Sequence, residues 1–339
     1  MSVVRSCDNG AIVLADNEVL AATLQEIEGG QARSAQAIEL LRTFKHAGLF
    51  NKKPVVSLQE ARIHQNEQSV EMLFGAGRHN VLVRCDDVAL ARDIGRIVAP
   101  LRIKKETCEP HLVEIVSSRE EYTVVSGGIV VSDRNDLAVA RHCVLSEILT
   151  VLHGRGTITA ILHAASIAKE GKGIILAGDS GSGKSTLAHA LAQSGWGLVA
   201  DDLTALDRNA LIRAFPTRIS LKPGSWQRLP AEDLRRATVG NLGDMDVRYV
   251  DPDEAMTFGT EIQAIGICFP RWDPASNMSV EKISPELALT RLIRCGGRVA
   301  GTDNSIEPLA RLVRQTPAYE ITYPDTASAL NFCASIAAQ

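Results

Sequence analysis

Apolar and polar residues follow two different spacings along the chain, and these spacings predict helices in some segments and strands in others. Residues 16–30 and 34–50 carry apolar side chains three and four positions apart and are closed by glycine, which predicts two helices. Alternation typical of strands appears in three later segments, 79–87, 111–118 and 121–133. Residues 87–101 return to helical spacing. We therefore expect residues 1–135 to form a smaller N-terminal α+β accessory domain.

The second part of the chain has the pattern of an α/β domain. Residues 136–154 have helical spacing and predict a helix with Val139, Val144 and Ile148 on a buried stripe. Residues 158–178 contain two apolar runs separated by "KEGK", which predicts a β-hairpin because Gly171 can supply a positive φ in the turn. A glycine-rich turn and another helix follow directly. These features predict an α/β domain over residues 136–339 in which an antiparallel hairpin precedes the glycine-rich turn.

The glycine-rich turn lies in "GIILAGDSGSGKSTLAHAL", residues 173–191, and matches the motif G-x-x-x-x-G-K-[ST]. A strand pattern before it and a helix pattern after it give the context in which this motif binds phosphate. Glycines let the backbone turn its N–H groups inward around an anion. Lys184 can reach the β- and γ-phosphates of a nucleotide, and the Ser185 hydroxyl can bind Mg²⁺. The expected nucleotide-binding residues are Gly178, Asp179, Ser180, Gly181, Ser182, Gly183, Lys184, Ser185 and Thr186.

Two adjacent carboxylates, Asp201 and Asp202, follow the short apolar segment 197–200. In P-loop proteins an aspartate at the end of a buried strand holds the Mg²⁺ that bridges the β- and γ-phosphates. A second carboxylate can accept the proton of an attacking hydroxyl. The alternative is that one of the two aspartates caps the next turn. The sequence therefore predicts a metal ligand and a base at this point and leaves their order open.

His163 is the third candidate for the site. If the hairpin turn is centred between Glu170 and Gly171, the strand register puts His163 opposite Gly178 and therefore beside the phosphate loop. The alternative is a histidine that is simply packed in the core.

Composition narrows the classes of partner and compartment. The 339-residue chain has a formal net charge of -4 and no run of five Lys or Arg residues, so we expect no nucleic-acid partner. Its seven cysteines are scattered and form no C-x-x-C pair, which argues against a disulfide framework and a zinc site. No apolar stretch reaches the roughly 18 residues of a membrane span, and the N-terminus lacks the pattern of a signal peptide. We expect a cytoplasmic protein without a membrane partner.

Residues 162–202, "LHAASIAKEGKGIILAGDSGSGKSTLAHALAQSGWGLVADD", resemble the HPr kinase/phosphorylase superfamily. The similarity is greatest to its smaller HPr-kinase-like relatives, some of which occur in lasso-peptide and other peptide-modification pathways. In that family a histidine precedes the P-loop by one strand, the loop reads G-D-S-G-x-G-K-S, and "ADD" follows the helix. All three features occur here. The resemblance implies a P-loop kinase domain of HPr-kinase type that uses ATP and Mg²⁺.

The resemblance also implies roles for individual residues. Lys184 and the loop amides would bind the triphosphate, and Ser185 and Asp201 would bind Mg²⁺. His163 and the aspartate pair would serve proton transfer from a Ser or Thr hydroxyl and balance charge, and we favour Asp202 as the base. The expected function is phosphoryl transfer from Mg-ATP to a hydroxyl of a peptide or small protein. The alternatives are a kinase for a small metabolite and a nucleotide-dependent switch that transfers nothing.

Cations downstream of the aspartates are the last candidates. HPr kinases carry a glutamate in this neighbourhood, whereas residues 218–227 read "RISLKPGSWQ" and contain no acid, which separates this chain from HPr kinase itself. Lys222 is the cation that we place in the site, and Arg218 and Arg271 are further candidates to stabilise charge on the transferring phosphoryl group. The segment is also typical of an edge strand that ends at Pro223. The accessory domain would grip the acceptor, regulate the enzyme or set its oligomeric state, and a homo-oligomer is one of these expectations.

Overall fold

The computed structural model describes residues 2–5, 12–15, 69–242, 245–300 and 306–338, which belong to two compact units, residues 1–62 and 63–339. In the first unit, β1 (Ser2–Arg5) pairs antiparallel with β2 (Ile12–Ala15). The helices predicted at 16–30 and 34–50 lie outside the described residues. A domain boundary between residues 135 and 136 stays a prediction, and the described residues from 69 onward all belong to the second unit.

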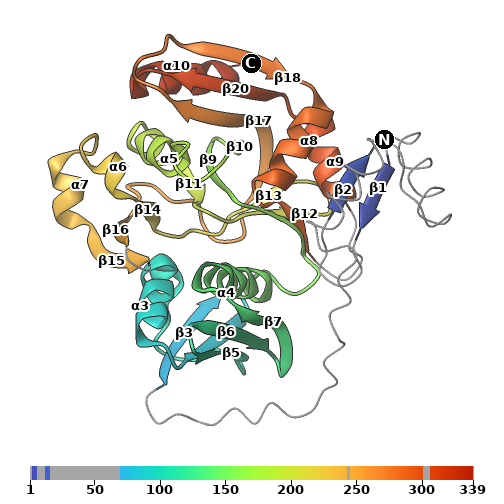
Figure 1. Cartoon of the computed structure of the whole chain (residues 1–339), viewed down its shortest axis with the longest axis vertical. Helices are drawn as coiled ribbons and strands as arrows, with labels where there is room; N and C mark the ends of the chain where they lie inside the picture. The colour runs from blue at the N-terminus through green and yellow to red at the C-terminus, as the bar shows by residue number, and fades with distance from the viewer. Residues whose placement is uncertain (1, 6–11, 16–68, 243–244, 301–305, 339) are drawn as a thin grey trace. The chain divides into compact units, whose positions relative to one another are not determined.

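A five-stranded sheet forms the first layer of the second unit (Figure 1). Its strands, in spatial order, are β3 (Val70–Ala76), β4 (His79–Cys85), β5 (His111–Ser118), β6 (Glu121–Ser126) and β7 (Ile129–Asn135). Only β4 and β5 are parallel, because the helix α3 (Val88–Ile97) and a 3-10 turn (Ala99–Leu101) cross between them. The Asp87 carboxylate caps α3 by accepting hydrogen bonds from the N–H groups of Ala89 and Leu90. These observations confirm the strands and the helix predicted at 79–133.

The helix α4 (Leu137–Leu152) covers this sheet and is apolar on almost every side. Val144 and Ile148 are fully buried, as the sequence predicts, whereas Val139 is 46% exposed and its predicted burial is wrong. Val139 lies in the first helical turn, whose start is fixed by the Asp136 cap. The core around α4 also includes Leu203, Ala205 and Phe215 from the part of the chain beyond the P-loop, so α4 is packed on more than one side, as a helix without a polar face must be.

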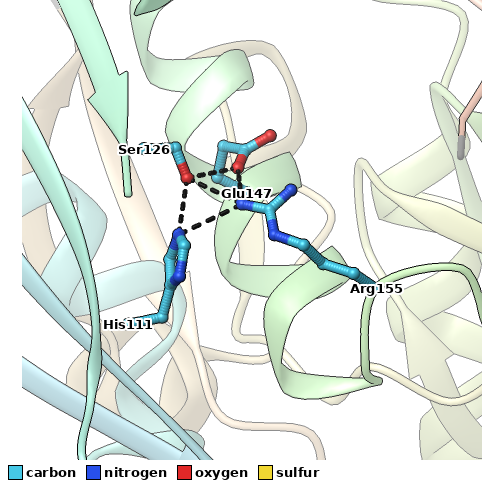
Figure 2. Close-up of polar contacts among 4 residues, drawn as sticks. All are labelled: His111, Ser126, Glu147 and Arg155. Carbon is cyan, nitrogen blue, oxygen red and sulfur yellow. Dashed lines mark hydrogen bonds and ion pairs between the residues drawn. The ribbon is translucent and has the colours of Figure 1, made fainter. Parts of the chain in front are cut away.

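A polar cluster ties α4 to the sheet beneath it (Figure 2). The Ser126 hydroxyl, on β6, donates to Glu147 Oε2 of α4 at 2.6 Å and lies 2.9 Å from Nε2 of His111 on β5. Arg155, in the connection after α4, donates from Nη2 to Ser126 Oγ at 2.9 Å and to Glu147 Oε2 at 2.8 Å. Because Arg155 also contacts the His111 ring at 3.1 Å, that ring nitrogen acts as an acceptor. The cluster joins α4 to both β5 and β6 by polar contacts.

A mixed ten-stranded sheet carries the P-loop. Its strands are β8 (Ile158–Leu162), β9 (Ala164–Lys169), β10 (Lys172–Ala177), β11 (Gly197–Ala200), β12 (Thr204–Asp207), β13 (Ile212–Arg213), β17 (Glu261–Trp272), β18 (Ser279–Ile283), β19 (Arg298–Val299) and β20 (Ala318–Tyr323). β10 pairs parallel with β17, and β17 with β20, while the other pairs are antiparallel. The predicted hairpin is β9–β10, but the apolar run before it is broken at His163 into β8 and β9. The mixed sheets and flanking helices confirm an α/β fold.

Helices lie on both faces of this sheet, which explains why β10 is a continuous apolar run. Ile174 and Leu176 pack with the helices α5 (Lys184–Gln193) and α10 (Thr326–Ala337), while Ile175 and Ala177 pack with α8 (Pro285–Arg294) and α9 (Glu307–Gln315). A strand buried on both faces has no polar alternation. Among the described residues, no helix combines the length and the apolar character that crossing a bilayer requires.

A small three-stranded sheet stands beside the P-loop helix (Figure 1). It consists of β14 (Ile219–Leu221), β16 (Met245–Val250) and β15 (Thr238–Leu242), with the short helices α6 (Pro223–Trp226) and α7 (Ala231–Arg236). β14 is an edge strand that ends just before Pro223, which confirms the edge-strand interpretation of this segment. Lys222 follows β14 directly and contacts Ser180 of the P-loop.

Candidate functional site

The strand order brings the P-loop, the aspartate pair and His163 to the same end of the strands in the large sheet. β10 and β11 are both antiparallel to β9 and flank it, so both end where β9 begins. The P-loop follows β10, the two aspartates follow β11, and His163 precedes β9. The last pair of the hairpin is Ala164 with Ala177, which puts His163 opposite Gly178 and confirms the register derived from the sequence.

The P-loop has the backbone geometry that its glycines permit. Gly183, at the start of α5, has a φ of 103°, and a Cβ there would lie 2.7 Å from the Tyr323 hydroxyl, so only glycine fits. Lys184 is buried, and its Nζ donates to the carbonyl oxygens of Gly178 at 2.7 Å and Asp179 at 3.1 Å. Burial lowers the pKa of Lys184. Carbonyl oxygens of the loop therefore hold the Lys184 ammonium group, which the sequence predicts to bind the phosphates.

Asp201 is tied to the P-loop helix. Its carboxylate accepts a hydrogen bond from the Ser185 hydroxyl at 2.9 Å and another from the backbone N–H of Ser220 at 2.9 Å. The side chain is buried, and burial together with the neighbouring Asp202 raises the pKa of Asp201 to about 7. The two oxygens that the sequence predicted as metal ligands, from Ser185 and Asp201, are therefore adjacent.

Asp202 lines the cavity, and its pKa is shifted in the opposite direction from that of Asp201. Its φ is +67°, a left-handed conformation that aspartate tolerates better than most residues, and this turn separates its side chain from that of Asp201. Burial alone would raise the pKa of Asp202, but nearby basic groups hold it below its usual value. These groups are Arg141, His163, Lys184 and Lys222. Asp202 is accordingly the ionised member of the pair.

His163 contacts the backbone of this turn. Its Nδ1 lies 3.2 Å from the carbonyl oxygen of Asp202, and its ring is 6.1 Å from that of His142 in an edge-on arrangement. Burial lowers the pKa of His163, and its Nδ1 is the donor of this hydrogen bond because a carbonyl oxygen can only accept. The side chain is half-buried and faces the cavity.

His163, Asp202 and part of the P-loop line one cavity of about 400 Å³, whereas Asp201 lies behind Ser185 and is not among the lining residues. The polar and glycine lining residues expected from the sequence are His163, Ser180, Gly181, Gly183, Lys184, Ser185, Thr186, Asp202 and Lys222. Lys222 Nζ donates to Ser180 Oγ at 2.6 Å, which brings the predicted cation to the P-loop. Arg218 instead pairs with Asp251 at 2.7 Å, and neither Arg218 nor Arg271 is among the cavity-lining residues. Of the three predicted cations, the structure brings only Lys222 into the site.

Two arginines in the cavity were not predicted from the sequence. Arg228 lies over the ring of Trp272, with its guanidinium carbon 3.8 Å from the ring centroid, and both residues line the cavity. Arg141 enters from α4. A signal for Arg141 was present, because it precedes the buried residues Val144, Leu145 and Ile148 by three, four and seven positions and therefore lies on a buried helix face. A buried arginine needs partners, and that requirement marks it as a candidate.

The residues present fit a nucleotide and Mg²⁺. The Ser182 hydroxyl, within the loop, is a buried polar atom without a hydrogen-bond partner in the described structure, as expected of a donor aimed at a ligand. Mg²⁺ in such sites takes one or two protein oxygens and fills its other positions with phosphate and water. Ser185 and Asp201 together supply two such oxygens. The part of the chain that the structure describes holds no cluster of three or more His, Cys, Asp or Glu side chains arranged for a metal.

Comparison with protein families and with curated proteins finds no match. Comparison with solved structures finds the HPr(Ser) kinase/phosphatase from Coxiella burnetii, which is 15% identical. The alignment covers 52% of this chain and 96% of that one, with a TM-score of 0.23. At that score and identity the likeness carries no argument about function.

Proposed function

We propose that this protein is a Mg-ATP-dependent kinase that transfers a phosphoryl group to a hydroxyl, with a Ser or Thr of a peptide or small protein as the acceptor. The observation that carries the proposal is the Asp202 carboxylate, which lines the same cavity as Lys184 and Ser185 of the P-loop. Asp201, beside Ser185, would already supply the carboxylate that Mg²⁺ needs, so the second carboxylate is available to accept the proton of an acceptor hydroxyl.

The residues divide the chemistry between them. The bond between the γ-phosphorus and the β,γ-bridging oxygen breaks, the acceptor oxygen bonds to the phosphorus, and Asp202 takes the hydroxyl proton. Lys184 and Lys222 balance the charge that shifts toward the β-phosphate and the transferring group. Ser185 and Asp201 would hold Mg²⁺, which screens the phosphate charges when bound. His163 holds the Asp202 turn through its carbonyl oxygen.

The acceptor class rests on the resemblance of residues 162–202 described above. A small-metabolite hydroxyl would use the same groups, because the chemistry at the phosphorus is identical. A nucleotide-dependent switch would bind Mg-ATP and transfer nothing. The three possibilities share the P-loop and differ only in what receives the phosphoryl group.

The test incubates the purified full chain with γ-labelled Mg-ATP and a panel of Ser/Thr peptides, small proteins and hydroxyl metabolites. Label on a peptide or protein hydroxyl supports the proposal, and label on a metabolite alone replaces the acceptor class. Binding of Mg-ATP without any transfer supports the switch and overturns the kinase. Lys184→Ala is the matched control, and we expect it to lower turnover by about 10³-fold or more because it removes the cation that reaches the phosphates.

A further inference from the structure

Arg141 is the one group in the cavity supplied by the helix that covers the five-stranded sheet. Its side chain is 12% exposed, whereas most arginines on helices of globular proteins lie in solvent. The other charged lining residues come from the P-loop, from the turn after β11 and from the segment after β14. Arg141 therefore reaches the site from a separate layer of the unit.

Two buried residues fix the position of this arginine. Arg141 Nε donates to Asp93 Oδ2 of α3 at 2.7 Å, and the Asp93 side chain is only 4% exposed. The Tyr249 hydroxyl, on β16, donates to the other carboxylate oxygen of Asp93. Three elements, α3, α4 and β16, thus hold one guanidinium group in place. A buried ion pair contributes little stability beyond what an apolar pair of the same size would give, so packing alone does not account for this arrangement.

The outer edge of the guanidinium is left for a ligand. A guanidinium has five N–H donors, and Nε is the only one of these for which the described residues supply an acceptor. The same side chain lines the cavity with Lys184 and Asp202. Its free donors therefore lie on the wall of the cavity that also holds the proposed base.

We infer that Arg141 is a catalytic residue that contacts the transferring phosphoryl group, supplied in cis by α4, and that Asp93 and Tyr249 are positioning residues for it. This inference rests on the proposed kinase function. The two free nitrogens of a planar guanidinium match two equatorial oxygens of a phosphoryl group in transfer. An arginine in this role stabilises the charge on those oxygens and has little effect on the bound ground state.

The test measures binding of a mimic of the transferring group, so it needs no acceptor. The affinity of the full chain for Mg-ADP is measured with and without aluminium fluoride, which imitates a phosphoryl group in transfer. We expect wild type to gain about 100-fold in affinity from aluminium fluoride. Arg141→Ala should bind Mg-ADP alone within about 3-fold of wild type and lose most of the gain. Tyr249→Phe keeps the aromatic ring and should lose part of the gain in affinity.

Matched variants separate this role from a structural one. Arg92, an exposed arginine on α3 next to Asp93, is the control, and Arg92→Ala should keep the full gain. Arg141→Lys keeps the charge beside Asp93 and loses the planar fork, so it should fold and still lose most of the gain. The double variant Asp93→Asn with Arg141→Ala removes both members of the buried pair and serves if Arg141→Ala does not fold. Added guanidinium should restore part of the gain to Arg141→Ala alone.

The outcomes distinguish the two claims. If wild type binds neither Mg-ATP nor Mg-ADP, the proposed function fails and this inference fails with it. If wild type binds nucleotide but gains nothing from aluminium fluoride, or if Arg141→Ala and Arg141→Lys keep the full gain, only the inference is overturned. Arg141 would then be a structural partner of Asp93, and its variants would change the melting temperature alone.

Discussion

His163 allows a close test of how the site is held together, because its contact with the Asp202 turn is a single hydrogen bond of known length. Two variants are compared, His163→Ala and His163→Asn. Alanine removes both the ring and the Nδ1 donor, whereas asparagine keeps an N–H group near the position of Nδ1. The difference between the two variants therefore isolates the hydrogen bond to the Asp202 carbonyl, which measures 3.2 Å.

The expected magnitudes follow from that geometry. A net hydrogen bond contributes about 1 kcal/mol, or roughly 5-fold in rate if it holds the base in its working position. A side chain that takes part in proton transfer, as the resemblance implies for His163, contributes about 10²- to 10⁴-fold. We expect kcat to fall about 100-fold or more in His163→Ala and about 5-fold less in His163→Asn. Because the ring lines the cavity and is only half-buried, we expect the melting temperature to change by a few degrees at most.

The assay is steady-state ATP turnover and a thermal melt on the same preparation of each variant. Mg-ATP affinity is measured alongside, so that a loss of nucleotide binding is not mistaken for a loss of rate. A variant that melts many degrees lower yet turns over ATP at the wild-type rate would refute the reasoning. His163 would then be a core histidine, and the cavity would lose one of its proposed working groups.

Three further predictions concern the carboxylates, the pH dependence of stability and the polar cluster. Asp201→Asn should weaken Mg-ATP binding and Asp202→Asn should mainly lower kcat, as measured by calorimetry and single-turnover rates; the opposite pattern would exchange their roles. Burial lowers the pKa of His153 to about 4, so the folded protein keeps this ring neutral while the unfolded chain takes up a proton below about pH 6.5. Stability is therefore lost as pH falls. Denaturant titrations should show that His153→Gln loses about 1.5 kcal/mol less stability than wild type between pH 6.5 and 5, and equal losses would contradict the assigned shift. Ser126→Ala should cost about 1–3 kcal/mol of unfolding free energy, because it removes the hydroxyl that links Glu147 to the sheet, and an unchanged urea midpoint would show that the cluster adds nothing.

The hairpin and the motifs around it were predictable because their geometry is local. The turn at Glu170 and Gly171, both with positive φ, fixes the register of β9 and β10, and with it the place of His163 opposite Gly178. The aspartates follow their strand directly, so strand topology alone brings them to the loop. The alternation of apolar and polar residues also predicted β5 at the residues where it occurs, 111–118.

The parts that could not be predicted depend on contacts between distant segments. Arg141 and Asp93 are 48 positions apart, and the Tyr249 hydroxyl that completes their arrangement is 156 positions from Asp93. No periodicity in one segment carries information about a partner in another. Val139 was wrongly placed for a related reason, because an apolar spacing shows which face of a helix is apolar and not how far along the helix its neighbours extend.

The position of α4 has a consequence for how this unit unfolds. Its apolar side chains share one core with the five-stranded sheet and with Leu203, Ala205 and Phe215, which belong to the segment after the two aspartates. Unfolding of that sheet would expose the apolar residues next to the Asp202 turn, and removal of the chain before α4 would expose the side of the helix that faces the sheet. Chemical denaturation should accordingly give a single cooperative transition in which the small sheet and the phosphate loop lose protection against hydrogen exchange together.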